Sequence, residues 1–273
     1  MKLLTKSRFK LALSCPNKLY YTRKKQYANT SNEYPFLEAL AQGGFQVEEL
    51  ARLTYPDGVL IEGKDWDYDW LVAETNQLLQ QENVVIFEAA FKHEGLFIRT
   101  DILVKKGNHI QLIEVKAKSY HPSDEYVLVS KRGKLVSAWK PYLFDVAFQR
   151  YVIQKAQPNW HINSYLMLAN KQKKAQIDGL NQLFRISRNS DNRTGIIKKV
   201  NHISEIGDTV LGKINVDGVL NDIESGKHTY FEHLNFKESI AVFSDYYQKD
   251  KYFNYPINYA SCKGCEFKAT PEQ

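Results

Sequence analysis

The chain has 273 residues, of which 43% are hydrophobic and 25% are charged, a composition typical of a globular protein with a buried core. No window has the apolar length of a transmembrane helix, so we expect a cytoplasmic protein without a membrane partner. The net charge of +6 and the sequence pI of about 8.9 suit a polyanionic partner, although basic clusters on a solvated surface would give the same values.

The first 81 residues are predicted to be mainly helical. Ser7 can cap a short helix that ends at Cys15-Pro16. A longer helix is expected over 33–55, with apolar residues on more than one side, and another over 66–81.

Glu49 is the residue of interest in the long helix. It lies between Phe45 and Leu53 in the apolar pattern, which would make it a buried carboxylate. A solvated glutamate beside Glu48 fits the same periodicity equally well, so both interpretations stay open.

Three strands are expected next, over 84–92, 96–105 and 109–119. Apolar alternation assigns one face of the last two strands to the core, which leaves Asp101, Glu114 and Lys116 together on the other face. If Gly107-Asn108 forms a two-residue loop, Asp101 lies directly opposite Glu114. With a four-residue loop the two are diagonal neighbours. Both registers bring the carboxylates together.

Two adjacent carboxylates repel each other unless a divalent cation lies between them, and Mg²⁺ or Mn²⁺ is the expected ion. With the lysine, this pattern is the outline of a metal-dependent phosphodiesterase site. The alternative is a solvated hairpin face, because so loose a motif also arises by chance. Pro56-Asp57 followed by Glu62-Gly63-Lys64 matches the literal pattern better, but the interval is too short for two paired strands and a turn.

The remaining elements complete an α/β pattern. Pro141 begins a helix, a strand is expected over 162–168, and a last helix over 236–248. This order predicts one domain over 1–273 with a central mixed sheet flanked by helices. The stretch 170–235 has a weaker pattern, with a clear loop over 189–193, and we expect an accessory helical insertion there.

Taken together, these features resemble the PD-(D/E)XK nuclease superfamily, and in particular its RecB-type branch with the CRISPR adaptation nucleases and related iron-sulfur proteins. The resemblance covers nearly the whole chain except about 170–235, and it implies a restriction-endonuclease-like core. It is carried by the hairpin and by Ser7-Arg8 with Cys15-Pro16 and Tyr20-Tyr21, by Gly44 through Glu49, and by Cys262-Lys263-Gly264-Cys265.

The resemblance implies roles for the hairpin residues. Asp101 and Glu114 would ligate the metal, together with the carbonyl of Val115, and Glu49 would help directly or through a bound water. Lys116 would polarise the attacking water or neutralise the phosphate as negative charge accumulates on it.

The resemblance also points to nucleic-acid contacts. Gln149 and Tyr151 look like the family's glutamine-and-tyrosine motif, which contacts DNA or the catalytic lysine, although the tyrosine is closer to the glutamine than usual. Lys131 and Arg132, in a basic loop, are the other expected nucleic-acid-binding residues.

All three cysteines could converge on one metal, because a C-x2-C pair presents two thiolates and a remote cysteine can bring the chain ends together. Relatives in the family use such a set, Cys15, Cys262 and Cys265 here, for an iron-sulfur cluster. They carry a further cysteine after the pair, which this chain lacks, so either that ligand is truncated away or the site is incomplete. Zinc, or no metal, fits a lone C-x2-C equally well.

The expected function is metal-dependent DNA hydrolysis by a RecB-like exonuclease in repair, recombination or mobile-element defence. Single-stranded DNA or duplex ends would be the substrate, beside a helicase or defence-system partner. A non-catalytic nucleic-acid-binding module and a purely structural metal-binding protein are the alternatives.

Overall fold

The computed structural model describes residues 2–30, 35–64, 66–188, 194–231, 233–254 and 262–269. The helices are α1 Lys6–Ser14, α2 Asn17–Tyr21, α3 Pro35–Arg52, α4 Tyr68–Leu78, α5 Lys140–Ala156, α6 Asp217–Glu224 and α7 Phe236–Gln248, with 3-10 turns η2 Leu180–Leu183 and η3 Ile203–Glu205. The strands are β1 Leu4–Thr5, β2 Tyr27–Asn29, β3 Val59–Leu60, β4 Asn83–Phe87, β5 Ala90–His93, β6 Leu96–Arg99, β7 Ile102–Lys106, β8 His109–Tyr120, β9 His161–Asn170, β10 Phe184–Arg188, β11 Thr194–Lys198, β12 Leu211–Asn215 and β13 Phe267–Ala269.

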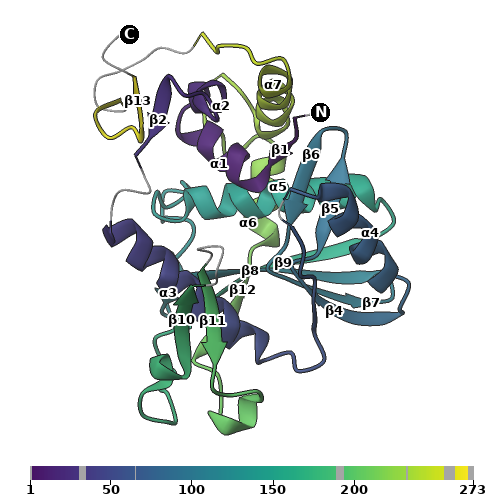
Figure 1. The fold of residues 1–273 in the computed structure, drawn as a ribbon, viewed down its shortest axis with the longest axis vertical. Coiled ribbons are helices and arrows are strands. Elements are labelled where there is room, and N and C mark those ends of the chain that lie inside the picture. The colour runs from purple at the N-terminus through teal and green to yellow at the C-terminus, as the bar shows by residue number, and fades with distance from the viewer. Residues whose placement is uncertain are drawn as a thin grey trace.

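A six-stranded mixed sheet, in the order β12-β9-β8-β7-β4-β3, forms the centre of the fold and confirms the predicted α/β class. The parallel pair β8 and β9 is connected through α5, as a parallel connection requires a crossover. Helix α5 crosses one face of the sheet, while α3 and the β10-β11 hairpin lie on the other (Figure 1). Each face therefore has its own hydrophobic core.

The strands predicted over 84–92 and 96–105 are each divided in two, so this part of the prediction was wrong. The breaks fall at Glu88, whose φ of 61° leaves the β region, and at the bend around Asp101. Strands β4 and β7 stay in the central sheet, while β5 and β6 form a separate three-stranded sheet with β1. Asp101 therefore lies at the corner between the two sheets.

The β7-β8 hairpin has the two-residue loop, since Lys106 pairs with His109 and Gly107 adopts a φ of +58°. Both faces of this hairpin are buried. Ile102 and Val115 contribute to the core on the α3 side, and Leu103 and Leu112 to the core on the α5 side. The face that carries Glu114 is therefore not a solvated one.

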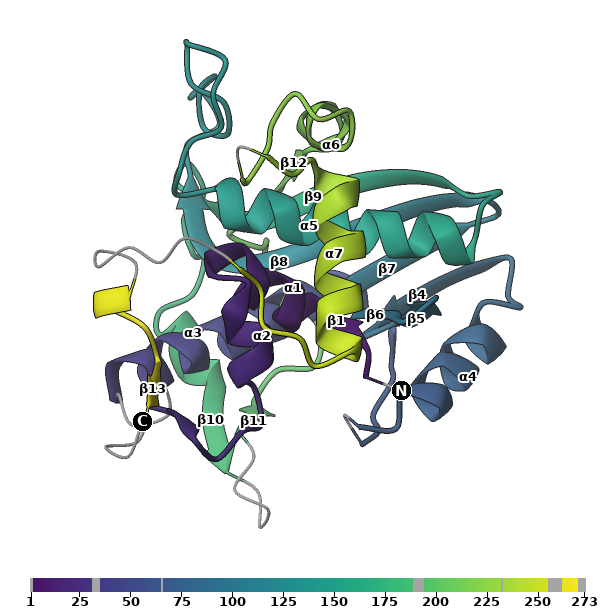
Figure 2. The same ribbon diagram turned by 90° about the horizontal axis from the view of Figure 1, so that it is seen from above.

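The first and last parts of the chain pack together beside the sheets, with α1, α2 and α7 adjacent (Figure 2). Strand β1 pairs in parallel with β6, and β2 pairs with β13. Helix α1 begins two residues earlier than predicted. Thr5, not Ser7, caps it, and its hydroxyl oxygen accepts a 3.3 Å hydrogen bond from the Arg8 amide. Helix α7 has the predicted bounds.

The stretch expected to be a helical insertion contains three strands, β10, β11 and β12, as well as α6 and the two 3-10 turns. Strands β10 and β11 form a hairpin against α3, where the Gln46 side-chain amide donates to the Phe184 carbonyl at 2.6 Å. Strand β12 joins the central sheet at its edge. Short strands give little periodicity, and the long-range partners that stabilise these three cannot be read from the local pattern. The loop predicted over 189–193 lies outside the described residues.

Within the described part of the chain, no helix combines the length and apolar character needed to cross a membrane.

Candidate active site

Asp101 and Glu114, called the acid pair below, meet where the two sheets diverge. Glu114 is fully buried on β8, and Asp101 is 9% exposed in the bend before β7. Asp101 Oδ2 accepts a 2.7 Å hydrogen bond from the amide of Val115. This bond fixes the Asp101 carboxylate next to the strand that carries Glu114.

Two ammonium groups lie against the acid pair. Lys6 Nζ is 3.3 Å from Asp101 Oδ1 and 3.1 Å from Glu114 Oε2, so one cation bridges both acids. Lys116 Nζ contacts Glu114 Oε1 and lies 3.9 Å from Asp101 Oδ2. The structure thus brings together Asp101, Glu114 and Lys116, and adds Lys6 from the first turn of α1.

Burial and charge act in opposite directions on these groups. Burial alone would raise the pKa of Glu114, but the ammonium groups of Lys116 and Lys6 hold that pKa well below its usual range. Burial would likewise lower the pKa of Lys6, but Asp101 and Glu114 raise it well above its ordinary value. The centre is therefore a set of mutually neutralised charges in which Glu114 and Lys6 are ionised.

Gln149 and Asp145 on α5 form a second layer behind Glu114. The Gln149 amide nitrogen donates to Glu114 Oε2 at 2.8 Å and to Asp145 Oδ1 at 3.3 Å, and both residues are fully buried. Burial and the nearby Glu114 charge raise the pKa of Asp145 to about 6, although Lys10 lies 3.2 Å from its other oxygen. Gln149 therefore orients the Glu114 carboxylate. The prediction that Gln149 contacts a nucleic acid does not fit its full burial.

No hydrogen bond or ion pair joins Glu49 to the acid pair within the described residues. Its carboxylate is bonded to Arg52 at 2.7 Å and to Lys198 on β11 at 3.3 Å. Burial raises the pKa of the neighbouring Glu48, and the negative charges of Asp101 and Glu88 raise it further, to about 8. Glu48 is therefore close enough to Asp101 for the charge of Asp101 to raise its pKa.

Glu88 is a further carboxylate near Asp101. It pairs with Arg52 at 3.1 Å and with Arg99 at 3.3 Å, and burial, together with the Asp101 charge, raises its pKa. Glu48, Glu88 and the two arginines also line a cavity of about 640 Å³ between α3 and the sheet. Asp101 and Glu114 themselves do not line this cavity.

The other predicted nucleic-acid-binding residues, Tyr151, Lys131 and Arg132, are not joined to the acid pair by any contact within the described residues. Tyr151 is half-buried on α5, packs edge-on against Phe236 at 6.1 Å, and lines a different cavity with Arg150 and Lys155. Lys131 and Arg132 are exposed in the loop between β8 and α5, where Lys131 lies over the ring of Tyr126 at 5.2 Å. They are free to contact a ligand, but no contact connects them to the acid pair.

The cysteines are partly brought together. Cys15 ends α1 and is close enough to Cys265 for the two thiols to interact electrostatically, while burial raises the pKa of Cys15. The Cys265 amide donates to the Cys262 carbonyl at 3.0 Å, which closes the C-x2-C turn. All three thiols are free, and their convergence on one metal stays a prediction.

The sequence analysis did not identify Lys6, Asp145 or Glu48. Signals for the first two are present in the sequence. Lys6 and Lys10 are one turn apart on α1, and Asp145 and Gln149 are one turn apart in an otherwise apolar stretch of α5. Polar residues at such spacing on a buried face indicate partners elsewhere in the fold. Nothing local distinguishes Glu48 from Glu49.

Carboxylate oxygens are the ligands that Mg²⁺ and Mn²⁺ prefer, and the acid pair already holds a positive charge, the Lys6 ammonium, between its oxygens. The pair therefore fits a divalent cation as two of its ligands. In the described ranges, however, no group of three or more aspartate, glutamate, histidine or cysteine side chains is arranged to hold a metal. A metal here would depend on the acid pair, backbone oxygen and water.

Comparison with known proteins gave no match to a family model, a curated protein or a solved structure.

Proposed function

We propose that this protein is a metal-dependent nuclease that hydrolyses phosphodiester bonds in DNA, with the acid pair and Lys116 as its catalytic groups. The observation that supports this best is the contact of two buried carboxylates with two lysine ammonium groups at the corner of the sheets. Charge concentrated in this way on buried residues is costly to the fold, and it is typical of catalytic sites.

Each residue has a role that follows from its contacts. Asp101 and Glu114 would hold the divalent cation, which supplies Lewis acidity and lowers the pKa of a bound water. Lys116, in contact with Glu114 and near Asp101, would stabilise the negative charge that develops on the phosphate oxygens. Gln149 keeps the Glu114 carboxylate in place through its 2.8 Å bond.

Glu48 completes the proposed site from α3. Its pKa of about 8 means that near neutral pH it carries a proton in the absence of metal. A divalent cation on the acid pair would reduce the negative field that Glu48 experiences, and would favour its ionised form. Glu48 is then placed to accept a hydrogen bond from water at the site.

The direct test is cleavage of labelled linear duplex and single-stranded DNA with Mg²⁺ or Mn²⁺. We expect strand cleavage by the wild-type protein and loss of about 100-fold or more in rate for Asp101→Asn, Glu114→Gln and Lys116→Met. Asp57→Asn is the matched control, since Asp57 is an exposed carboxylate outside the site. Cleavage that survives Asp101→Asn, or is lost equally in Asp57→Asn, would contradict the proposal.

One observation favours a second candidate, a nucleic-acid-binding module without catalysis. Lys6 and Lys116 already neutralise the acid pair, so the fold does not require a metal to offset these charges. This candidate predicts salt-sensitive DNA binding with no turnover under any divalent cation, and binding that is unchanged by Mn²⁺.

A further inference from the structure

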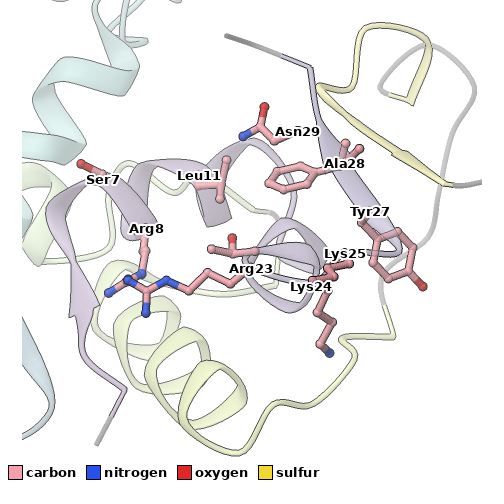
Figure 3. Close-up of a pocket in the computed structure, with 11 residues that line it drawn as sticks. Ser7, Arg8, Leu11, Arg23, Lys24, Lys25, Tyr27, Ala28 and Asn29 are labelled. Carbon is pink, nitrogen blue, oxygen red and sulfur yellow. The ribbon is translucent and has the colours of Figure 1, made fainter. Parts of the chain in front are cut away.

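A cleft of about 540 Å³ opens where the first and last parts of the chain meet (Figure 3). It lies between α1, the turn after α2, and the small sheet formed by β2 and β13. We call it the N-terminal cleft, and its lining residues include Ser7, Arg8, Leu11, Arg23, Lys25 and Phe267.

Two guanidinium groups are directed toward one another in this cleft (Figure 3). Arg8 extends from α1 and Arg23 from the turn after α2. Arg8 donates to the Leu3 carbonyl at 2.8 Å and lies 4.9 Å from the centre of the Tyr247 ring. These two contacts fix the Arg8 side chain without neutralising its charge, because a carbonyl and a ring carry no net charge.

Arg23 has no anionic partner either. It is exposed, and neither a hydrogen bond nor an ion pair joins its side chain to any described residue. Its backbone adopts a φ of +66°, a left-handed conformation that is unfavourable for arginine. The adjacent Lys24 shows the contrast, since it lies 3.1 Å from Asp250 and over the ring of Tyr20.

Like charges held together favour an anion between them. Guanidinium groups bind phosphate through paired N–H donors, and two such groups that face each other present four or more donors to one phosphate. The apolar floor at Leu11 and Phe267 lowers the local dielectric and strengthens that attraction.

Helix α1 connects this cleft to the acid pair. Lys6 and Lys10 contact the buried acids, while Ser7, Arg8 and Leu11 line the cleft. We propose that the N-terminal cleft binds a backbone phosphate of a nucleic-acid strand between Arg8 and Arg23, at a position separate from the acid pair. The identification of the anion as nucleic acid rests on the proposed function, whereas the phosphate chemistry follows from the two guanidinium groups.

The test is binding of a fluorescent single-stranded oligonucleotide in EDTA, where hydrolysis cannot occur, measured by anisotropy across a range of salt concentrations. We expect Arg8→Gln and Arg23→Gln each to weaken binding about tenfold, and to reduce the slope of log K against log salt by about one. The two effects should not add fully in the double variant, because both groups hold one phosphate.

Two further Arg23 variants separate binding from folding. Arg23→Gly removes the guanidinium and also relieves the positive φ, so it should melt no lower than the wild type and still bind weakly. Arg23→Lys keeps the charge without the paired donors and should give an intermediate affinity. Arg185→Gln, which removes an exposed arginine on β10, is the matched control and should stay within about twofold of the wild type.

Wild-type affinity in Arg23→Gly, or an equal loss in Arg185→Gln, would overturn the proposal. So would salt-independent binding, or loss of the Arg23 effect with an abasic oligonucleotide, since the contact is to the backbone. This assay needs no turnover, so its result does not depend on whether the protein is a nuclease. A protein that binds through Arg23 but never cleaves DNA would refute only the proposed function.

Discussion

Replacement of Lys6 by methionine tests whether the acid pair is a cation site. Methionine keeps most of the volume of the lysine side chain and removes its charge. Lys6 Nζ lies within 3.1 to 3.3 Å of three carboxylate oxygens, and its side chain is 20% exposed. An ammonium-carboxylate pair about 4 Å apart is worth about 4 kcal/mol at an effective dielectric of 20, and loss of one partner of a buried pair costs about 3–5 kcal/mol.

We therefore expect Lys6→Met to lower the free energy of unfolding by about 3 kcal/mol in EDTA, at the lower end of that range because Lys6 is partly exposed and Lys116 remains. Mn²⁺ should then restore much of the loss, because a divalent ion can take the position from which the ammonium was removed. Saturation at about 100 times the Kd contributes about 2.7 kcal/mol.

The measurement is urea unfolding with and without MnCl₂, together with a Mn²⁺ titration followed by electron paramagnetic resonance. Lys6→Met should bind Mn²⁺ at least tenfold more tightly than the wild type. Lys10→Met is the control, because Lys10 lies one turn along the same helix and contacts Asp145 instead. If Lys6→Met is as stable as the wild type, or binds Mn²⁺ no better than Lys10→Met does, the acid pair is not a cation site.

Three other expectations concern single residues. The pKa of Glu48 is about 8 in the folded protein and about 4.5, the ordinary value of a glutamate, in the unfolded chain, so Glu48 makes stability fall as pH rises between these values. Glu48→Gln should therefore reduce the difference in the free energy of unfolding between pH 5 and pH 8, measured by urea unfolding in EDTA. Gln149→Leu should cost about 1–3 kcal/mol in thermal unfolding and reduce DNA cleavage, because Glu114 loses its orienting donor, and unchanged cleavage would show that orientation is unnecessary. If the thiols hold a metal, protein purified without oxygen should contain iron or zinc by elemental analysis and lose it in Cys265→Ser, whereas equal metal content in both proteins would exclude Cys265 as a ligand.

Much of the site was predictable because its geometry is local. The alternation of apolar residues over 98–117, together with the Gly107-Asn108 turn, is sufficient to place Asp101 next to Glu114. The same alternation places Lys116 on the side of the strand that carries Glu114. Long helices such as α5 and α7 were likewise predictable, since their apolar periodicity extends over several turns.

The rest depends on contacts between distant segments. Lys6 reaches the acid pair only because β1 pairs with β6, and no local pattern in the first ten residues reveals that pairing. The choice between Glu48 and Glu49 requires the rotation of α3 about its axis, which the β10-β11 hairpin and the sheet determine together. The division of the strand predicted over 84–92 follows from a left-handed residue, Glu88, that is not glycine. The strand predicted over 96–105 is divided at the bend around Asp101, where the chain passes from one sheet to the other.

The pairing of Leu4 and Thr5 with β6 has a consequence for how the protein folds. Lys6 and its carboxylate partners are separated by 95 and 108 positions, so their contacts close long loops and are expected to form late in folding. Until then Glu114 would lack one of its counter-charges, which disfavours its burial in a partly folded chain. Docking of β1 and α1 against β6 and completion of the charged centre should therefore occur as one cooperative, late event.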